Sequence, residues 1–174
     1  NTAIREVLPE LKDAGGSDID LKVACLTFSS GCKWMYSTPI ASDSFQWTNV
    51  DADGVTDLGS ACRELNDKLS KNGFLKAPSG SVAPVIFLLS DGEPTDRYYV
   101  SSAATSLKQV ATVYTIGFGS GADTQILQNT IASSTDKYFS ASAGDYLSLS
   151  NAFSQATGSI SGEFEPTQST DGLI

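Results

Sequence analysis

The sequence predicts an α/β fold of three layers, in which helices cover both faces of a mostly parallel sheet. Stretches with strand character alternate with amphipathic helical stretches along most of the chain. One of them, Val85–Leu89, is an unbroken apolar run bounded by turn residues, as is typical of a strand buried on both faces. The length of 174 residues and the 40% hydrophobic content suit one globular domain with a substantial core.

The chain begins with a predicted helix and a predicted β-hairpin. Residues Asn1–Ala14 carry an apolar stripe at helical spacing, although Pro9 within it favours a kink. The segment Ile19–Ser29 alternates and then becomes apolar, which indicates a strand. Gly31 marks a tight turn, and Lys33–Ile40 is the expected hairpin partner, with the polar alternation of an antiparallel edge strand.

A polar loop is expected over residues 43–57, with Phe45 and Trp47 reaching into the core. Thr56 and Asp57 then open a predicted helix that ends at Asn72-Gly73. Its apolar stripe consists of Leu58, Cys62, Leu65 and Leu69.

Beyond the strand at Val85–Leu89, helices and strands continue to alternate. The expected helices are Tyr98–Val110, Asp123–Ser134 and Tyr146–Ala156, and the expected strands are Thr112–Gly117 and Lys137–Ala141. The folded domain is predicted to span residues 1–157. Residues 158–174 are rich in Ser, Gly, Thr and Glu and are predicted to form a flexible tail.

Composition excludes several classes of function. A net charge of −9 without a basic patch argues against nucleic acids as partners. No apolar run approaches the length of a membrane span. The absence of histidine removes Ser-His-Asp and Cys-His catalysis and makes a zinc site unfavourable, so oxygen ligands for Mg²⁺, Mn²⁺ or Ca²⁺ are expected instead. Cys25, Cys32 and Cys62 are sparse and odd in number, which indicates free thiols, packed into the core in the case of Cys25 and Cys62.

Carboxylates gather just after the most apolar strand. Asp91, Glu93 and Asp96 follow Val85–Leu89, at the edge where open parallel sheets bind their ligands. The loop Asp53-Gly54-Val55-Thr56 precedes a helix and is expected near the same edge. A threonine hydroxyl and an aspartate together suit a hard cation that keeps several waters. Two simpler interpretations stay open, a plain Asp-Gly turn at Asp91 and a helix N-cap at Thr56.

Several stretches, in this order, resemble a von Willebrand factor A domain. They are NTAIREVLPEL (1–11), LTFSS (26–30), VTDLGSACREL (55–65), FLLSDGEPTD (87–96) and TIGFG (115–119). The resemblance covers nearly all of the predicted domain and is strongest to the bacterial TerY-type group. It implies a doubly wound, Rossmann-like sheet and a binding module rather than an enzyme.

The resemblance also implies a metal-ion-dependent adhesion site, in which Mg²⁺ or Mn²⁺ binds a carboxylate of a partner protein. Thr56 and Asp91 match the family's metal-binding threonine and aspartate. The rim that selects the partner is then Asp53, Gly54, Glu93, Thr95 and Asp96. The TerY-type likeness implies a cytoplasmic bacterial protein in stress response or signalling. A secreted adhesin is less favoured, because sequons and paired cysteines are lacking.

The family's D-x-S-x-S loop does not occur in this sequence, which begins within the helix that follows that loop. The family's first strand lies between the strands that correspond to 21–28 and 85–89. Without it, backbone groups of both strands lack partners, at about 1–3 kcal/mol for each buried group. We therefore expect an upstream segment of roughly thirty residues to supply that strand.

Three other motifs carry alternatives. NVDADGVTD (49–57) resembles the nucleophile loop of haloacid-dehalogenase-like phosphatases, with Asp51 as nucleophile and Asp53 as acid/base, but no apolar strand precedes it. GFGSGA (117–122) matches a dinucleotide-binding turn without its acidic partner, and a tight strand-to-helix turn accounts for it better. Asp51–Gly54 is not an EF-hand loop, because its glycine comes too early and no closing glutamate follows.

Overall fold

The computed structural model describes residues 1–13, 20–51, 53–70, 72–76, 78, 81–91 and 93–160. Its helices are α1 (Thr2–Asp13), α2 (Leu58–Leu69), α3 (Arg97–Lys108), α4 (Thr124–Ile126), the π-helical η1 (Leu127–Ile131), the 3-10 helix η2 (Thr135–Lys137) and α5 (Tyr146–Ile160). Its strands are β1 (Lys22–Val23), β2 (Leu26–Ser29), β3 (Gly31–Trp34), β4 (Ile40–Ala41), β5 (Val85–Ser90), β6 (Thr112–Phe118) and β7 (Tyr138–Ala141).

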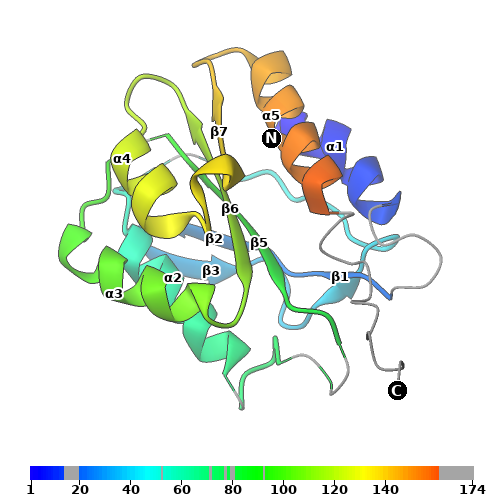
Figure 1. Ribbon diagram of the computed structural model, residues 1–174. Helices are drawn as coiled ribbons and strands as arrows, with labels where there is room; N and C mark the ends of the chain where they lie inside the picture. The colour runs from blue at the N-terminus through cyan, green and yellow to red at the C-terminus, as the bar shows by residue number, and fades with distance from the viewer. Residues whose placement is uncertain are drawn as a thin grey trace, which may run out of the picture.

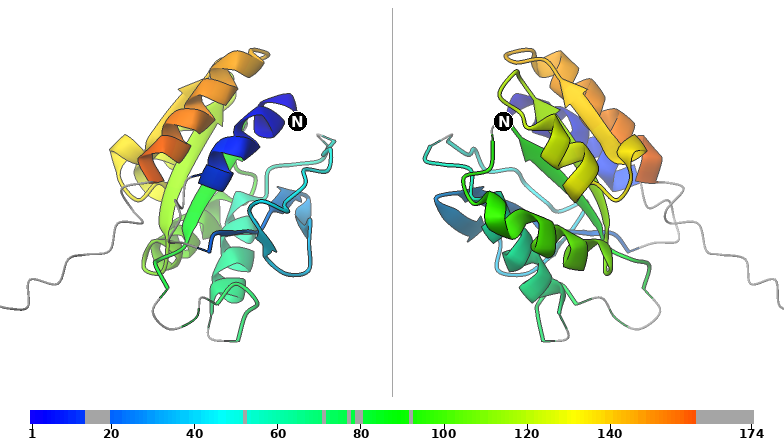
Figure 2. Two further views of the ribbon diagram at one scale, coloured as in Figure 1. Left: turned by 90° about the vertical axis from the view of Figure 1, so that its right-hand side faces the viewer. Right: turned by 60° about the vertical axis from the view of Figure 1, so that its left-hand side comes forward.

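The predicted three-layer α/β architecture is confirmed. Strands β5, β6 and β7 form a parallel sheet in that order, with Leu88 opposite Thr115 and Ile116 opposite Phe139. Helices α1 and α5 lie side by side on one face of this sheet, and α2, α3 and α4 lie on the other (Figure 1; Figure 2). Because the strands are parallel, their carboxyl ends and the loops that follow them meet at one edge.

Two hydrophobic clusters hold the layers together, and β5 contributes to both. Ile86 and Leu88 pack into the cluster of α2, α3 and η1. Val85, Phe87 and Leu89 pack into the cluster of α1 and α5. Alternate side chains of a strand point to opposite faces, so a strand covered on both faces must be apolar throughout. The unbroken run that the sequence shows at this position thus has a direct structural cause.

The amino-terminal strands form two small antiparallel pairs rather than one hairpin at the edge of the main sheet. Strand β2 pairs with β3, and β1 pairs with β4. The predicted strand Ile19–Ser29 is therefore interrupted, and Cys25 lies between β1 and β2 rather than within a strand. Its backbone carbonyl nevertheless accepts a hydrogen bond from the Met35 amide at 2.9 Å, which continues the pairing past the break.

Within the described part of the chain, β2 pairs only with β3, and β5 pairs only with β6. Direct pairing of β2 with β5 would have contradicted the expected additional strand between them. The described residues show no such pairing. The additional strand stays a prediction.

The helices follow the sequence pattern with local differences. The helix expected over 123–134 is a short α-helical turn that continues as the π-helix η1, where the buried Thr115 hydroxyl donates to the Leu127 carbonyl at 3.1 Å. Helix α2 ends at Leu69, before the expected Asn72-Gly73, and α5 extends to Ile160. Phe45 is buried as predicted, whereas Trp47 is half-buried. Most of the predicted tail, residues 161–174, lies outside the described residues.

No helix among the described residues combines the length and the apolar character that a membrane span requires.

Candidate metal and partner-binding site

Asp96 caps the amino terminus of α2 from a distant point in the sequence. Its Oδ1 accepts a hydrogen bond from the Gly59 amide at 2.8 Å, and its Oδ2 accepts one from the Ser60 amide at 2.7 Å. The first amides of a helix have no partner within the helix, and a carboxylate there also complements the helix dipole. A side chain on Gly59 would place its Cβ 3.0 Å from Asp96 Oδ2, so the close approach favours glycine. Asp96 thus fixes the start of α3 against the start of α2.

Thr56 is not the N-cap of α2. Asp57 occupies the N-cap position, and the side chain of Asp96 accepts the hydrogen bonds that an N-cap residue would usually accept. Asp57 is the residue that precedes α2, and its own carboxylate makes no hydrogen bond to the helix. Asp57 Oδ1 accepts a hydrogen bond from the Thr95 hydroxyl at 2.7 Å. The Thr56 carbonyl accepts one from the Thr95 amide at 2.9 Å. These contacts join the loop after β5 to the loop before α2, so Thr56 and Thr95 lie next to each other.

Asp91 follows β5 directly, and its side chain is exposed at the carboxyl edge of the sheet. Its backbone lies against the loop that follows β6. A Cβ added to Gly121 would lie 2.8 Å from the Asp91 carbonyl oxygen. Gly121 therefore allows the loop after β6 to pack closely against the backbone of Asp91, in the loop after β5. Gly92, the next residue, lies outside the described residues.

Asp53 and Gly54 lie against the β2–β3 turn. Asp53 Oδ1 accepts a hydrogen bond from the Gly54 amide at 2.7 Å, and Gly54 has a φ of +84°, which favours glycine. The Val55 amide donates to the Ser30 hydroxyl at 3.4 Å, and the Asp57 amide donates to the Ser29 carbonyl at 3.1 Å. The turn between the two strands thereby positions the loop that carries Thr56.

Glu93 and Arg97 form the other side of the rim. Arg97 makes an exposed ion pair with Glu93 at 3.4 Å and a shorter one with Asp123. Asp123 also accepts a hydrogen bond from the Ile126 amide at 3.0 Å, so its carboxylate caps α4. The Arg97–Asp123 contact links α3 to α4.

The donor set fits a hard cation better than a soft one. Thr56 and Asp91 offer a hydroxyl and a carboxylate, the oxygen donors that Mg²⁺ and Mn²⁺ prefer. Asp57 and Asp96 are already engaged by Thr95 and by α2. Among the described residues, no group of three or more His, Cys, Asp and Glu side chains is placed to enclose a metal ion. A cation held by this chain's own residues would therefore keep several waters or other ligands.

The phosphatase alternative finds no matching geometry at Asp51. Asp51 is exposed in an irregular loop and does not follow a strand. This loop is held by Asn1, whose side-chain amide donates to the Val50 carbonyl at 2.9 Å and whose Oδ1 accepts from the Trp47 indole at 3.0 Å. The GFGSGA turn leads from β6 to α4, where Gly119 has a φ of +81°. It is the tight turn that its glycines predicted.

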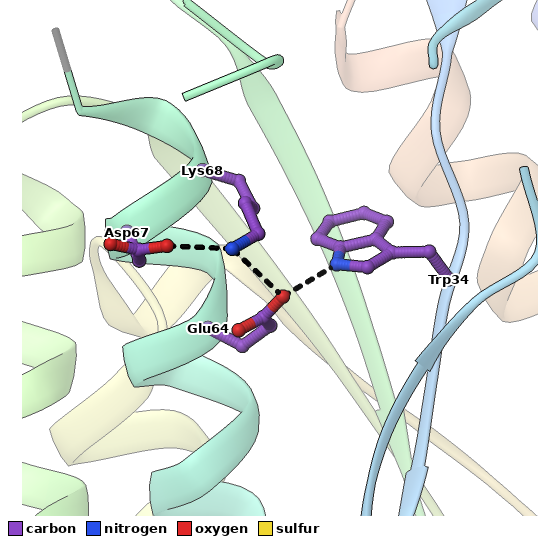
Figure 3. Close-up of polar contacts among 4 residues, drawn as sticks. All are labelled: Trp34, Glu64, Asp67 and Lys68. Carbon is purple, nitrogen blue, oxygen red and sulfur yellow. Dashed lines mark hydrogen bonds and ion pairs between the residues drawn. The ribbon is translucent and has the colours of Figure 1, made fainter. Parts of the chain in front are cut away.

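A polar network that sequence patterns did not reveal holds the β2–β3 pair against α2. The Trp34 indole donates to Glu64 Oε1 at 2.7 Å, and Lys68 bridges Glu64 at 3.4 Å and Asp67 at 2.6 Å (Figure 3). The Trp34 ring also meets Phe74 edge-on, with centroids 4.9 Å apart. Glu64, Asp67 and Lys68 all lie in α2, whereas Trp34 lies in β3, so the contact that joins the two elements has no signal in the sequence spacing.

The three cysteines are free, as expected. Burial raises the pKa of the Cys25 thiol to about 11. Burial, followed by the charges of Asp96 and Cys32, raises the pKa of the Cys62 thiol to about 12. Cys32 is exposed, yet partial burial and the carboxylate of Glu64 also raise its thiol pKa. None of the three has the lowered pKa of a reactive nucleophile.

Comparison with known proteins decides the family. The model of the von Willebrand factor type A domain matches residues 3–155. The chain belongs to the von Willebrand factor type A family. No curated protein matches this von Willebrand factor A domain.

Several solved structures share its fold. A von Willebrand factor type A protein from Catenulispora acidiphila has a TM-score of 0.65 and 17% identity, over 92% of this chain and 38% of that one. Proximal thread matrix protein 1 from the mussel byssus, with a zinc-occupied MIDAS motif, has a TM-score of 0.61 and 20% identity, over 91% and 40%. The ArnB paralog VWA2 from Sulfolobus acidocaldarius has a TM-score of 0.57 and 21% identity, over 87% and 39%. This chain thus spans about two fifths of the length of these structures.

Proposed function

We propose that this von Willebrand factor A domain is a metal-ion-dependent protein-binding module. In this proposal Thr56 and Asp91 hold Mg²⁺ or Mn²⁺ at the carboxyl edge of the sheet, and a carboxylate of a partner protein completes the coordination. The observation that carries the proposal is the joining of the two loops there: the Thr95 amide donates to the Thr56 carbonyl at 2.9 Å, just after the strand that delivers Asp91.

The charge of the domain supports a cation at this position. A chain with a net charge of −9 repels an acidic partner, whereas a bound divalent cation reverses the local field. The mussel byssus protein shares this fold and has a zinc-occupied MIDAS motif, which supports a bound metal in this domain. Asp53, Gly54, Glu93, Thr95 and Asp96 form the rim around it. Asp96 and Thr95 also hold the rim together through their contacts to α2 and Asp57.

The finer assignment rests on the sequence motifs alone. We propose a TerY-type domain that acts in the bacterial cytoplasm, in stress response or signalling. On this proposal the domain turns over no phosphate ester. Replacement of Asp51, the nucleophile of the phosphatase alternative, would leave both metal binding and partner binding unchanged.

Direct metal binding tests the proposal. Free Mn²⁺ gives a strong paramagnetic resonance signal that falls when the ion binds to protein, so titration of the chain measures the affinity. We expect binding by the unaltered chain and by Asp51→Asn, and its loss in Asp91→Asn and Thr56→Val. Equal binding by Asp91→Asn and the unaltered chain would place the cation elsewhere and overturn the proposed site.

A further inference from the structure

Two adjacent tyrosines at the start of α3 are exposed to an unusual degree. The exposed fraction is 89% for Tyr98 and 45% for Tyr99. The core-facing residues of the same helix, such as Val100 and Leu107, are buried, so the tyrosines have no role in the core. Large aromatic side chains on a surface are typical of binding sites, because they offer a wide apolar area at little entropic cost.

One of the two tyrosine rings already contacts a positively charged group of the domain itself. The Arg63 guanidinium lies over the Tyr99 ring, 4.3 Å from its centroid, and donates to the Ser60 hydroxyl at 3.2 Å. Tyr98 meets Tyr99 edge-on, with centroids 5.2 Å apart and planes at 89°. One ring thus already holds a cation, and the highly exposed Tyr98 ring offers the same electron-rich face to solvent. We call Tyr98, Tyr99 and Arg63 the tyrosine patch.

The charges around the tyrosine patch favour a basic ligand. Two guanidinium groups lie near the start of α3, and both are engaged: Arg97 pairs with Glu93 and Asp123, and Arg63 covers Tyr99. A shallow groove between β3 and α2 is lined in part by Arg63 and by Glu64 and Asp67, two carboxylates that share the single ammonium group of Lys68. With a chain charge of −9, the long-range field also attracts cations.

We propose that the tyrosine patch binds a lysine- or arginine-bearing extended segment of a protein partner, with the partner's cation on the Tyr98 ring. The partner chain then continues toward the groove between β3 and α2. The patch is adjacent to the proposed metal site, but this contact needs no metal. A partner that uses both sites would carry a carboxylate for the cation and basic residues beside it.

A peptide titration in the presence of EDTA tests the inference apart from the proposed metal site. The probe is an end-blocked peptide of alternating glycine and lysine, and its counterpart replaces lysine with glutamate. Binding is followed by the ring signals of ¹³C-labelled tyrosine in nuclear magnetic resonance. We expect the lysine peptide to shift the Tyr98 and Tyr99 signals and the glutamate peptide to shift neither.

Variants at Tyr98 separate the cation–ring contact from simple apolar docking. Tyr98→Phe keeps an electron-rich ring and should bind the lysine peptide about as well as the unaltered chain. Tyr98→Leu keeps an apolar surface without a ring and should bind about two- to fivefold more weakly. The matched control is Tyr146→Leu, which removes an exposed tyrosine of α5 and should change nothing.

Three results would overturn the inference: no shift at millimolar lysine peptide, equal affinity of Tyr98→Phe and Tyr98→Leu, or equal binding of the glutamate peptide. Binding of the lysine peptide in EDTA by a chain that binds no Mn²⁺ would leave this inference standing and remove the proposed metal site.

Discussion

Replacement of Asp96 by alanine should destabilise the domain, because Asp96 caps α2 from outside that helix. The substitution removes both charge-assisted hydrogen bonds, from Gly59 and Ser60, at 2.8 and 2.7 Å. Loss of a helix cap costs about 0.5–2 kcal/mol, and loss of a charge at a helix amino terminus adds up to roughly 1 kcal/mol at a partly exposed site. The free energy of unfolding should therefore fall by about 2 kcal/mol. For a domain of this size, that corresponds to a decrease of roughly 4–8 °C in Tm.

Urea denaturation followed by circular dichroism measures this change. Asp96→Asn keeps one oxygen acceptor without the charge and should lie between alanine and the unaltered chain. Asp91→Ala is the matched control without added metal, because Asp91 is exposed and caps no helix, and it should leave stability within about 0.5 kcal/mol. If Asp96→Ala is as stable as Asp91→Ala, Asp96 does not hold the start of α2 or the rim in place.

Three further substitutions or conditions test the contacts around the site. Gly121→Ala should destabilise by about 1–3 kcal/mol in urea, because its Cβ would lie 2.8 Å from the carbonyl oxygen of Asp91; an unchanged midpoint would show that the two loops are not held together. Trp34→Phe should cost about 1–2 kcal/mol through the lost hydrogen bond to Glu64, and a change below 0.5 kcal/mol would mean that the network in Figure 3 is not stabilising. The raised pKa of Cys32 should make its reaction with a thiol reagent at pH 8 slower than that of a free cysteine and faster as the pH rises; a rate at or above that of free cysteine would contradict the raised pKa.

The raised pKa values of the Cys25 and Cys62 thiols predict that the free energy of unfolding decreases at alkaline pH. Cys25 and Cys62 are neutral in the folded state up to about pH 11 and 12, whereas a thiol in the unfolded chain ionises near its ordinary pKa of 9.0. The unfolded state thus loses protons first as the pH rises. Their contribution to stability is fully present below about pH 9 and is lost as the pH rises through the folded pKa values.

The sequence predicted the structure best where burial determines the spacing of apolar residues along a strand or helix. The apolar run at Val85–Leu89 predicted a strand that is buried on both faces. The structure confirms it, since Ile86 and Leu88 face one core cluster and Phe87 and Leu89 face the other. The alternation of helices and strands gave the fold class for the same reason. The order of motifs predicted the family, which the match over residues 3–155 confirms.

Contacts between distant segments were not predictable from pattern. Asp96 lies more than thirty residues after the amides of α2 that it caps, so no local capping signal marks it. Thr56 has the local signature of an N-cap, yet Asp57 holds that position in the structure. The π-helix at Leu127–Ile131 likewise carries an ordinary helical stripe in sequence, and only the structure shows that the Thr115 hydroxyl bonds to the Leu127 carbonyl.

A melting curve with and without millimolar Mg²⁺ or Mn²⁺, repeated on Asp91→Ala, tests whether a cation binds at the end of β5. A ligand that binds only the folded state increases the free energy of unfolding, by about 2.7 kcal/mol at a hundredfold excess over Kd, and so raises Tm. We expect the cation to raise the Tm of the unaltered chain. Asp91→Ala should remove this rise and should melt at the same temperature as the unaltered chain when no metal is added. A cooperative melt that does not respond to the cation, or a rise that persists in Asp91→Ala, would contradict a metal site at the end of β5.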